Sequence, residues 1–202
     1  MRLNGKSASR LIVHFVKPEY PPVAKVNYIQ GRVKIEVEVN REGAVAEAHV
    51  IDGEPLLAAA AIEAVRKWRY RPLVNSTGAT PFRTYVNVNF SLHARKVAGL
   101  PGNAEEYLQK QVHPPEVITG PGNGFPSRTV QLRILVGPKG QVLDSIPLGD
   151  ANGYLHEARQ KVRSWKFRAA RWGALRIPWY LVVKVPIERA LVHGDTSSPD
   201  IR

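Results

Sequence analysis

The sequence predicts an α+β protein of two tandem small domains, each with the order strand, strand, helix, strand. Three observations lead to this prediction. A block that mixes aromatic and basic residues occurs twice, at 64–72 and 161–169. The chain repeats at a constant offset, and each copy shows strand periodicity followed by helix periodicity. We therefore expect an antiparallel sheet with one covering helix in each copy.

The repeat has an offset of 97 residues and runs without a gap. It takes Gly43 to Gly140, and it takes Trp68 to Trp165 within the repeated block. Two copies are too few for a solenoid, so the chain is interpreted as tandem domains. The other matching pairs are Val45 and Val142, Ala61 and Ala158, Val65-Arg66 and Val162-Arg163, Tyr70 and Phe167, Arg71 and Arg168, and Pro81 and Pro178.

The first strand of each copy alternates between apolar and polar residues. Arg32–Asn40 and Thr129–Val136 both place their apolar side chains on one face, which is typical of a half-buried strand. Turn residues follow each strand and end in Gly43 or Gly140, and glycine supplies the positive φ that hairpin turns need. We therefore expect a hairpin to a second strand.

A helix and a last strand complete each copy. Apolar residues fall on one helical stripe over Leu56–Trp68 and over Leu155–Trp165, and the strands that follow Pro81 and Pro178 alternate again. Cations of the repeated block lie off the stripe, where they compensate the helix dipole. The block is therefore interpreted as a helix end rather than as a nucleic-acid site. The aromatic residues predicted to be structural core are Trp68, Tyr70, Trp165 and Phe167.

Composition divides the chain into five segments, and turn residues mark the boundaries. In order, these are a basic N-terminal arm (1–16), the first domain (17–92), a Pro/Gly-rich linker with room for a short helix over 104–112 (93–126), the second domain (127–190) and a flexible tail (191–202).

The composition argues against several classes of function. The net charge is +12, and the chain has no cysteine, which excludes disulfides and thiolate metal sites. The histidines share no ligand spacing, and the Gly-rich run TGPGNG lacks the Lys-Ser/Thr of a P-loop. We therefore predict no metal, no cofactor, no catalytic residue and no enzymatic activity. Neither a signal peptide nor an apolar spanning segment is visible in the sequence.

The first copy resembles the C-terminal domain of the TonB energy-transducer family over residues 17–92. The second copy is similar but degraded, since it keeps Gly140-x-Val142 and Trp165-Lys166-Phe167 but has Ala169 where the family has Pro. The residues that carry the resemblance in the first copy are Tyr20-Pro21, Ile29-x-Gly31-x-Val33, Gly43-x-Val45, Trp68-Arg69-Tyr70-x-Pro72 and Val88-x-Phe90.

The resemblance implies a periplasmic module of Gram-negative bacteria that takes part in energy-coupled transport. In that family the domain binds an extended peptide, the TonB box, of outer-membrane transporters, and a membrane anchor and Pro-rich spacer connect it to inner-membrane proton-driven motor proteins. Tethering to the inner membrane would require an anchor upstream of Met1. The resemblance also implies that a lead segment lies beside the peptide groove, namely Lys17, Pro18, Glu19, Tyr20 and Pro21.

The last strand of the first copy is the predicted peptide-binding edge. A sheet edge presents unpaired main-chain groups to which an extended peptide can add. The last strand of the second copy carries Lys184 and Pro186, which protect an edge. The second copy is therefore expected to pack against the first or to contact an anionic surface. The outward residues of the first copy's last strand are neutral and polar: Tyr85, Asn87, Asn89 and Ser91.

Two other classes of function stay open. One is a structural adaptor of the cell envelope or a homodimer, favoured if the strand Arg83–Leu92 is covered within the fold or pairs with its sister strand. The other is electrostatic binding of an anionic surface or, less favoured, of nucleic acid, with a steep dependence on salt. The candidate residues for such binding are Arg159, Arg163, Lys166, Arg168 and Arg171.

Overall fold

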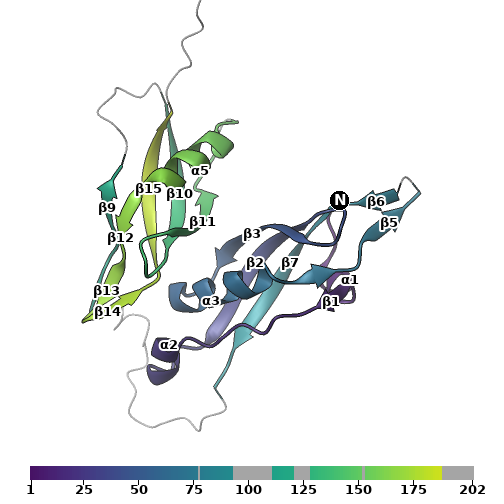
Figure 1. Cartoon of the computed structure of the whole chain (residues 1–202), viewed down its shortest axis with the longest axis horizontal. Coiled ribbons are helices and arrows are strands. Elements are labelled where there is room, and N and C mark those ends of the chain that lie inside the picture. Colours follow the sequence, from purple (N-terminus) through teal and green to yellow (C-terminus); the bar gives the residue numbers. More distant parts are fainter. Residues whose placement is uncertain (77, 93–110, 121–127, 152, 188–202) are drawn as a thin grey trace, which may run out of the picture.

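The computed structural model describes residues 1–76, 78–92, 111–120, 128–151 and 153–187. Two three-stranded antiparallel sheets, each with a helix packed against it, lie side by side (Figure 1). We call residues 1–92 the first unit and residues 111–187 the second unit. The predicted α+β class with small antiparallel sheets is therefore confirmed.

The first unit is built on the sheet β3-β2-β7. The central strand β2 buries Val33, Ile35 and Val37 completely, as its alternating sequence predicts. Its elements are α1 (Gly5–Ser9), β1 (Ile12–His14), α2 (Pro22–Val26), β2 (Gly31–Val39), β3 (Val45–Asp52), α3 (Pro55–Val65), β4 (Arg69–Tyr70), β5 (Leu73–Asn75), β6 (Gly78–Thr80) and β7 (Phe82–Phe90).

The second unit is built on the sheet β11-β10-β15, with α5 packed against it. Its elements are β8 (Val112–His113), β9 (Glu116–Thr119), β10 (Arg128–Val136), β11 (Val142–Pro147), α5 (Leu155–Ser164), β12 (Lys166–Arg168), β13 (Ala170–Trp172), β14 (Leu175–Ile177) and β15 (Trp179–Ile187).

Strands β8 and β9 lie in the segment that the sequence predicts to be a linker. They pair with β13 and β12, respectively, so this part of the chain belongs to the second unit. Composition could not reveal this, because strands this short form only where a partner edge offers hydrogen bonds. Most of the expected helix over 104–112 and the expected tail 191–202 lie outside the described residues.

The N-terminal segment, expected as a basic arm, is folded onto the first unit. Helix α1 buries Ala8, and Leu3 and Leu11 pack against the apolar core of this unit. Strand β1 pairs with β4, with Ile12 opposite Tyr70. The apolar side chains between the cations explain the difference, because burying them favours docking over a solvated arm.

Helix α3 is buried on nearly all sides, whereas its sequence predicts one apolar stripe. The helix begins at Pro55, where no main-chain N–H is needed. It packs on its own sheet, and its core cluster also includes Leu135, Ala170 and Ile177 of the second unit. The second unit also has a core of its own, which includes Leu132, Ile134 and Val162, so the two units share apolar packing in addition to it.

The repeated block spans the helix end in both units, and its aromatic residues lie beyond that end. Helices α3 and α5 end at Val65 and Ser164, so Trp68 and Trp165 lie past the helices and not on their stripes. Trp68 is still buried, and its indole N–H donates to the Val16 carbonyl at 2.8 Å. Trp165 is half-buried at the margin of the second core, because its extended backbone leaves the helix direction.

Tyr70 and Phe167 are both buried, and each contacts a turn glycine in the same way. A Cβ on Gly43 would lie 1.9 Å from the Tyr70 carbonyl oxygen, and one on Gly140 would lie 2.1 Å from that of Phe167. Both glycines have positive φ, +82° and +79°. This shared contact at the same offset supports the interpretation of the chain as a repeat.

We expect Gly43→Ala to destabilise the protein by at least about 2 kcal/mol, because strain at positive φ is added to a main-chain overlap. Gly78→Ala is the matched control, since Gly78 also has positive φ, +107°, but a Cβ added there would meet nothing within 4 Å. Thermal unfolding of both variants gives the measurement. Equal losses in the two variants would contradict the role of the close approach.

Candidate functional site

The first sheet has two edges, β3 and β7, and each is a candidate binding surface. Edge strands offer unpaired N–H and C=O groups to a partner strand. The availability of each edge depends on what already contacts those groups.

The β3 edge is closed by side chains of the second unit. Asp144 on β11 accepts a hydrogen bond from the Val50 N–H through Oδ2 at 2.7 Å. Arg133 on β10 donates from Nη2 to the carbonyl oxygens of Val50 and Ile51 at 3.0 and 2.9 Å. Side chains thus occupy main-chain groups that an added strand would need near the end of β3, at Val50 and Ile51.

His49 adds an ionic contact at the same edge. Its Nδ1 lies 2.8 Å from Asp144 Oδ1, and its Nε2 lies 3.2 Å from Glu47 Oε2. Burial alone disfavours the charged ring, but the hydrogen bond and charge of Asp144 outweigh this effect, so the pKa of His49 is raised. The hydrogen bond from His49 lowers the pKa of Glu47. His49 therefore links the two units through Asp144, and protonation of its ring strengthens this contact.

The β7 edge is contacted near its start by the N-terminal segment. The Arg83 N–H donates to the Met1 carbonyl oxygen and the Leu3 N–H donates to the Arg83 carbonyl oxygen, both at 2.8 Å. Alternate residues of a strand direct their main-chain groups to the same side. Asn87 and Asn89, which follow at this spacing, therefore direct theirs to the same edge. In the described part of the chain, no named strand other than β2 pairs with β7.

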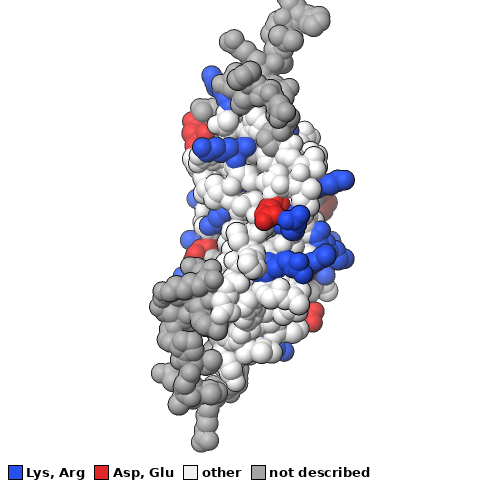
Figure 2. All heavy atoms as spheres, turned by 90° about the vertical axis from the view of Figure 1, so that its left-hand side faces the viewer, with Lys and Arg blue, Asp and Glu red and all other residues white. Residues whose placement is uncertain are grey.

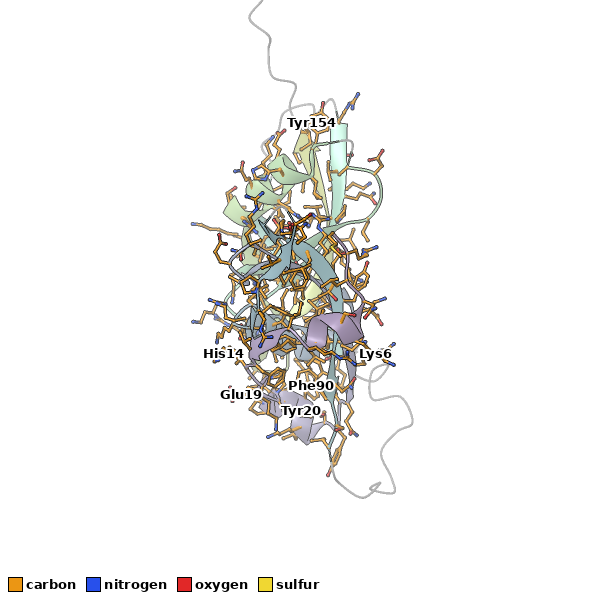
Figure 3. All side chains as sticks on the ribbon, turned by 90° about the vertical axis from the view of Figure 1, so that its right-hand side faces the viewer. Lys6, His14, Glu19, Tyr20, Phe90 and Tyr154 are labelled. Carbon is orange, nitrogen blue, oxygen red and sulfur yellow. The ribbon has the colours of Figure 1, made fainter. Side chains whose placement is uncertain are left out.

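Of the lead segment (residues 17–21), Tyr20 is the residue that contacts β7. The Tyr20 hydroxyl donates to the Ile29 carbonyl at 2.6 Å, and its ring packs edge-on against Phe90 with centroids 5.3 Å apart (Figure 3). Pro18 is half-buried and Ser91 lies just beyond β7. Lys17, Glu19 and Pro21 instead line a groove of about 550 Å³ beside α3, which residues of the second unit also line.

The predicted cationic residues fall into two places. Arg159 and Arg163 line a pocket of about 490 Å³ between the units, where Arg159 donates to the Ser145 carbonyl at 3.2 Å. Lys166, Arg168 and Arg171 are exposed on the strands β12 and β13. Figure 2 shows Lys and Arg side chains along the side of the molecule where these strands lie.

Sequence reasoning missed several residues of these surfaces. Arg171 pairs directly across β13 and β14 with Arg176, which was not singled out. Arg133 was missed because it is a polar residue of the alternating strand Thr129–Val136, and Asp144 because only a hairpin partner strand was expected after Gly140, with no role assigned to its residues. The signal for Asp144 was the run Val142–Pro147, in which a carboxylate stands within an otherwise apolar and small-residue strand.

The last strands of the two units do not pair with each other, since β7 and β15 belong to different sheets. Strand β15 carries its own protection. Pro186 lacks an N–H, and its carbonyl oxygen accepts a hydrogen bond from Lys161 Nζ at 3.2 Å. The edges of the two units thus differ in their capacity to accept a strand.

Residues 16–92 match the family described as the Gram-negative bacterial TonB protein C-terminal. These residues include the whole of the sheet β3-β2-β7, the helix α3 and the lead segment. Residues 16–92 form a TonB C-terminal domain. The match ends before the second unit.

The chain also has a structural likeness to the TonB C-terminal domain of Pseudomonas aeruginosa, solved in solution by NMR. The two share 22% sequence identity with a TM-score of 0.38, over 42% of this chain and 88% of that chain. None of the curated proteins matches the chain.

The described part of the chain contains neither a membrane-spanning helix nor a clustered metal site. No helix within it has the length and apolar character needed to cross a membrane. The same residues contain no group of three or more His, Cys, Asp or Glu side chains placed to hold a metal ion.

We expect the packing of the second unit against the TonB C-terminal domain to weaken as pH rises. The pKa of His49 is raised on folding, so its contribution is complete below its ordinary pKa, near 6.5, and is lost as pH rises through the raised value. Thermal unfolding across this range measures the effect.

His49→Gln should remove most of this pH dependence. His156→Gln is the matched control. His156 and His49 both line the pocket of about 490 Å³ between the units, but His156 is exposed. If the control removes the dependence equally, the contact between His49 and Asp144 is not its origin.

Proposed function

We propose that the TonB C-terminal domain binds an extended peptide of an outer-membrane transporter by strand addition to β7. The proposed setting is energy-coupled transport in the periplasm of a Gram-negative bacterium. The observation that carries the proposal is the contrast between edges. Asp144 and Arg133 occupy main-chain groups of β3 at Val50 and Ile51, whereas Asn87 and Asn89 on β7 direct main-chain groups away from the sheet.

Strand addition suits this edge for physical reasons. The residues Asn87 and Asn89 are neutral and exposed, so an approaching backbone meets neither a fixed charge nor a proline. Each residue that faces the edge supplies one donor and one acceptor, which gives affinity with little dependence on the side chains of the peptide. The partner β2 fixes the other side of β7 over its whole length, from Phe82 to Phe90.

The lead segment supports the far end of the same strand. Tyr20 packs against Phe90, the last residue of β7, and its hydroxyl is fixed by the Ile29 carbonyl. This contact holds the end of β7 in place while its edge groups engage a peptide. The groove lined by Lys17, Glu19 and Pro21 lies beside α3 and is not part of the proposed strand-binding edge.

The proposal is tested with Asn87→Pro and its control Asn87→Ala. Proline removes the edge-facing N–H and cannot pair, whereas alanine keeps the main chain intact. We expect Asn87→Pro to weaken binding at least about tenfold, since an unpaired main-chain group in a ladder costs about 1–3 kcal/mol. Asn87→Ala should bind like the unchanged protein.

The measurement is calorimetric titration with synthetic peptides from the N-terminal segments of outer-membrane TonB-dependent transporters, at low and high salt. Main-chain pairing predicts affinities that change little with salt. Circular dichroism checks that both variants are folded. Equal binding by the two variants, or binding that disappears at high salt, would exclude strand addition at Asn87.

A further inference from the structure

The N-terminal residues already pair with β7 in the manner of an added strand. Arg2 forms a parallel bridge with Arg83, flanked by the two main-chain hydrogen bonds of Met1 and Leu3. These bonds use both the N–H and the C=O that Arg83 directs to the edge. The first position of the proposed peptide site is thus occupied by the protein itself.

Side-chain contacts hold this segment against the strand. Arg2 Nη2 lies 2.9 Å from Glu36 Oε1 and donates to the Tyr85 hydroxyl at 2.7 Å. The guanidinium also stacks over the Tyr85 ring, 4.9 Å from its centroid, and Lys34 Nζ lies 4.7 Å from the same centroid. The Arg2 side chain therefore bridges β2 and β7.

The start of α1 covers the next position of the edge. A Cβ on Gly5 would lie 3.1 Å from the Tyr85 carbonyl oxygen, so the backbone of the segment runs close to that acceptor. Arg83 and Tyr85 are both screened, and Asn87 and Asn89 remain. An extended peptide can pair with the remaining half of the strand beside the segment, but it cannot pair along the whole of β7.

We propose that residues 1–5 act as an intramolecular competitor for the β7 edge, which a transporter peptide displaces in order to pair along the whole strand. This inference rests on the proposed function, because it concerns the regulation of the same site. The affinity of a peptide is then reduced by the fraction of molecules in which the segment is bound.

The contacts between residues 1–5 and β7 are weak enough to break and form again reversibly. The contacts are two main-chain hydrogen bonds, the hydrogen bond and ring contact of Arg2 with Tyr85, the ion pair of Arg2 with Glu36, and the packing of half-buried Leu3 on the core. Arg2 itself is exposed, and ion pairs at exposed positions contribute little. Ala8 in α1 is buried, so it can hold the rest of the helix on the core when residues 1–5 leave the edge.

The test compares the full chain with a deletion of residues 1–3, with Arg2→Ala and with Lys6→Ala. The deletion keeps the Asn4 cap, and Lys6→Ala removes an equal charge from helix α1 at an exposed position (Figure 3). Synthetic peptides from the N-terminal segments of outer-membrane TonB-dependent transporters serve as probes. We expect the deletion to raise affinity about tenfold. Arg2→Ala should raise it less, and Lys6→Ala should leave it unchanged.

NMR gives a second readout in the full chain. On saturation with peptide, the amide signals of Leu3 and Arg83 should shift, and the Leu3 amide should exchange with solvent faster because it loses its acceptor. If α1 unfolds in the deletion variant, Arg2→Ala and the Leu3 amide still decide the question.

The outcomes separate the two proposals. Equal affinities in all variants, with peptide shifts at Asn87 and Asn89, would overturn the competitor and leave the proposed function standing. Absence of peptide binding by the full chain and by every variant would overturn both. Equal gains in Arg2→Ala and Lys6→Ala would show a general effect of charge and would also overturn the competitor.

Discussion

The contact between the Asp144 carboxylate and the Val50 N–H is the interaction on which the arrangement of this protein depends. It places a buried acid of the second unit on the edge of the first sheet, where His49 and the Ser145 N–H also donate to it. A buried carboxylate is tolerated only with such partners, and their loss would leave uncompensated polar groups. The bond therefore fixes how the units meet.

Apolar packing follows from that meeting. With β11 beside β3, helix α3 is also enclosed outside the one apolar stripe that its sequence predicts. Residues of the second unit such as Leu135 and Ile177 join the core of the first unit. Burial of this apolar surface adds stability that neither small unit could reach alone. The same arrangement covers β3 and leaves β7 as the edge that faces away.

The two units share the contact between a turn glycine and a buried aromatic residue, but their edge strands differ. Gly43 and Gly140 make the same main-chain contact, which shows why these positions match in sequence. Edge residues carry no such constraint, since their main-chain groups can be left open or closed without altering the core. Pro186 and Lys161 protect β15 at one position, and within the described part of the chain residues 1–5 shield the start of β7.

The sequence alone determined the periodic elements, because strand alternation, helical stripes and turn glycines are local properties. It indicated β2, β10, α3, α5 and the last strands, and it identified the outward residues of β7. Tertiary structure decided what no local pattern encodes: the pairing of β8 and β9, the docking of residues 1–5 and the bond from Asp144 to Val50. These contacts join residues far apart in the chain, so their energy appears only when the partners meet in space.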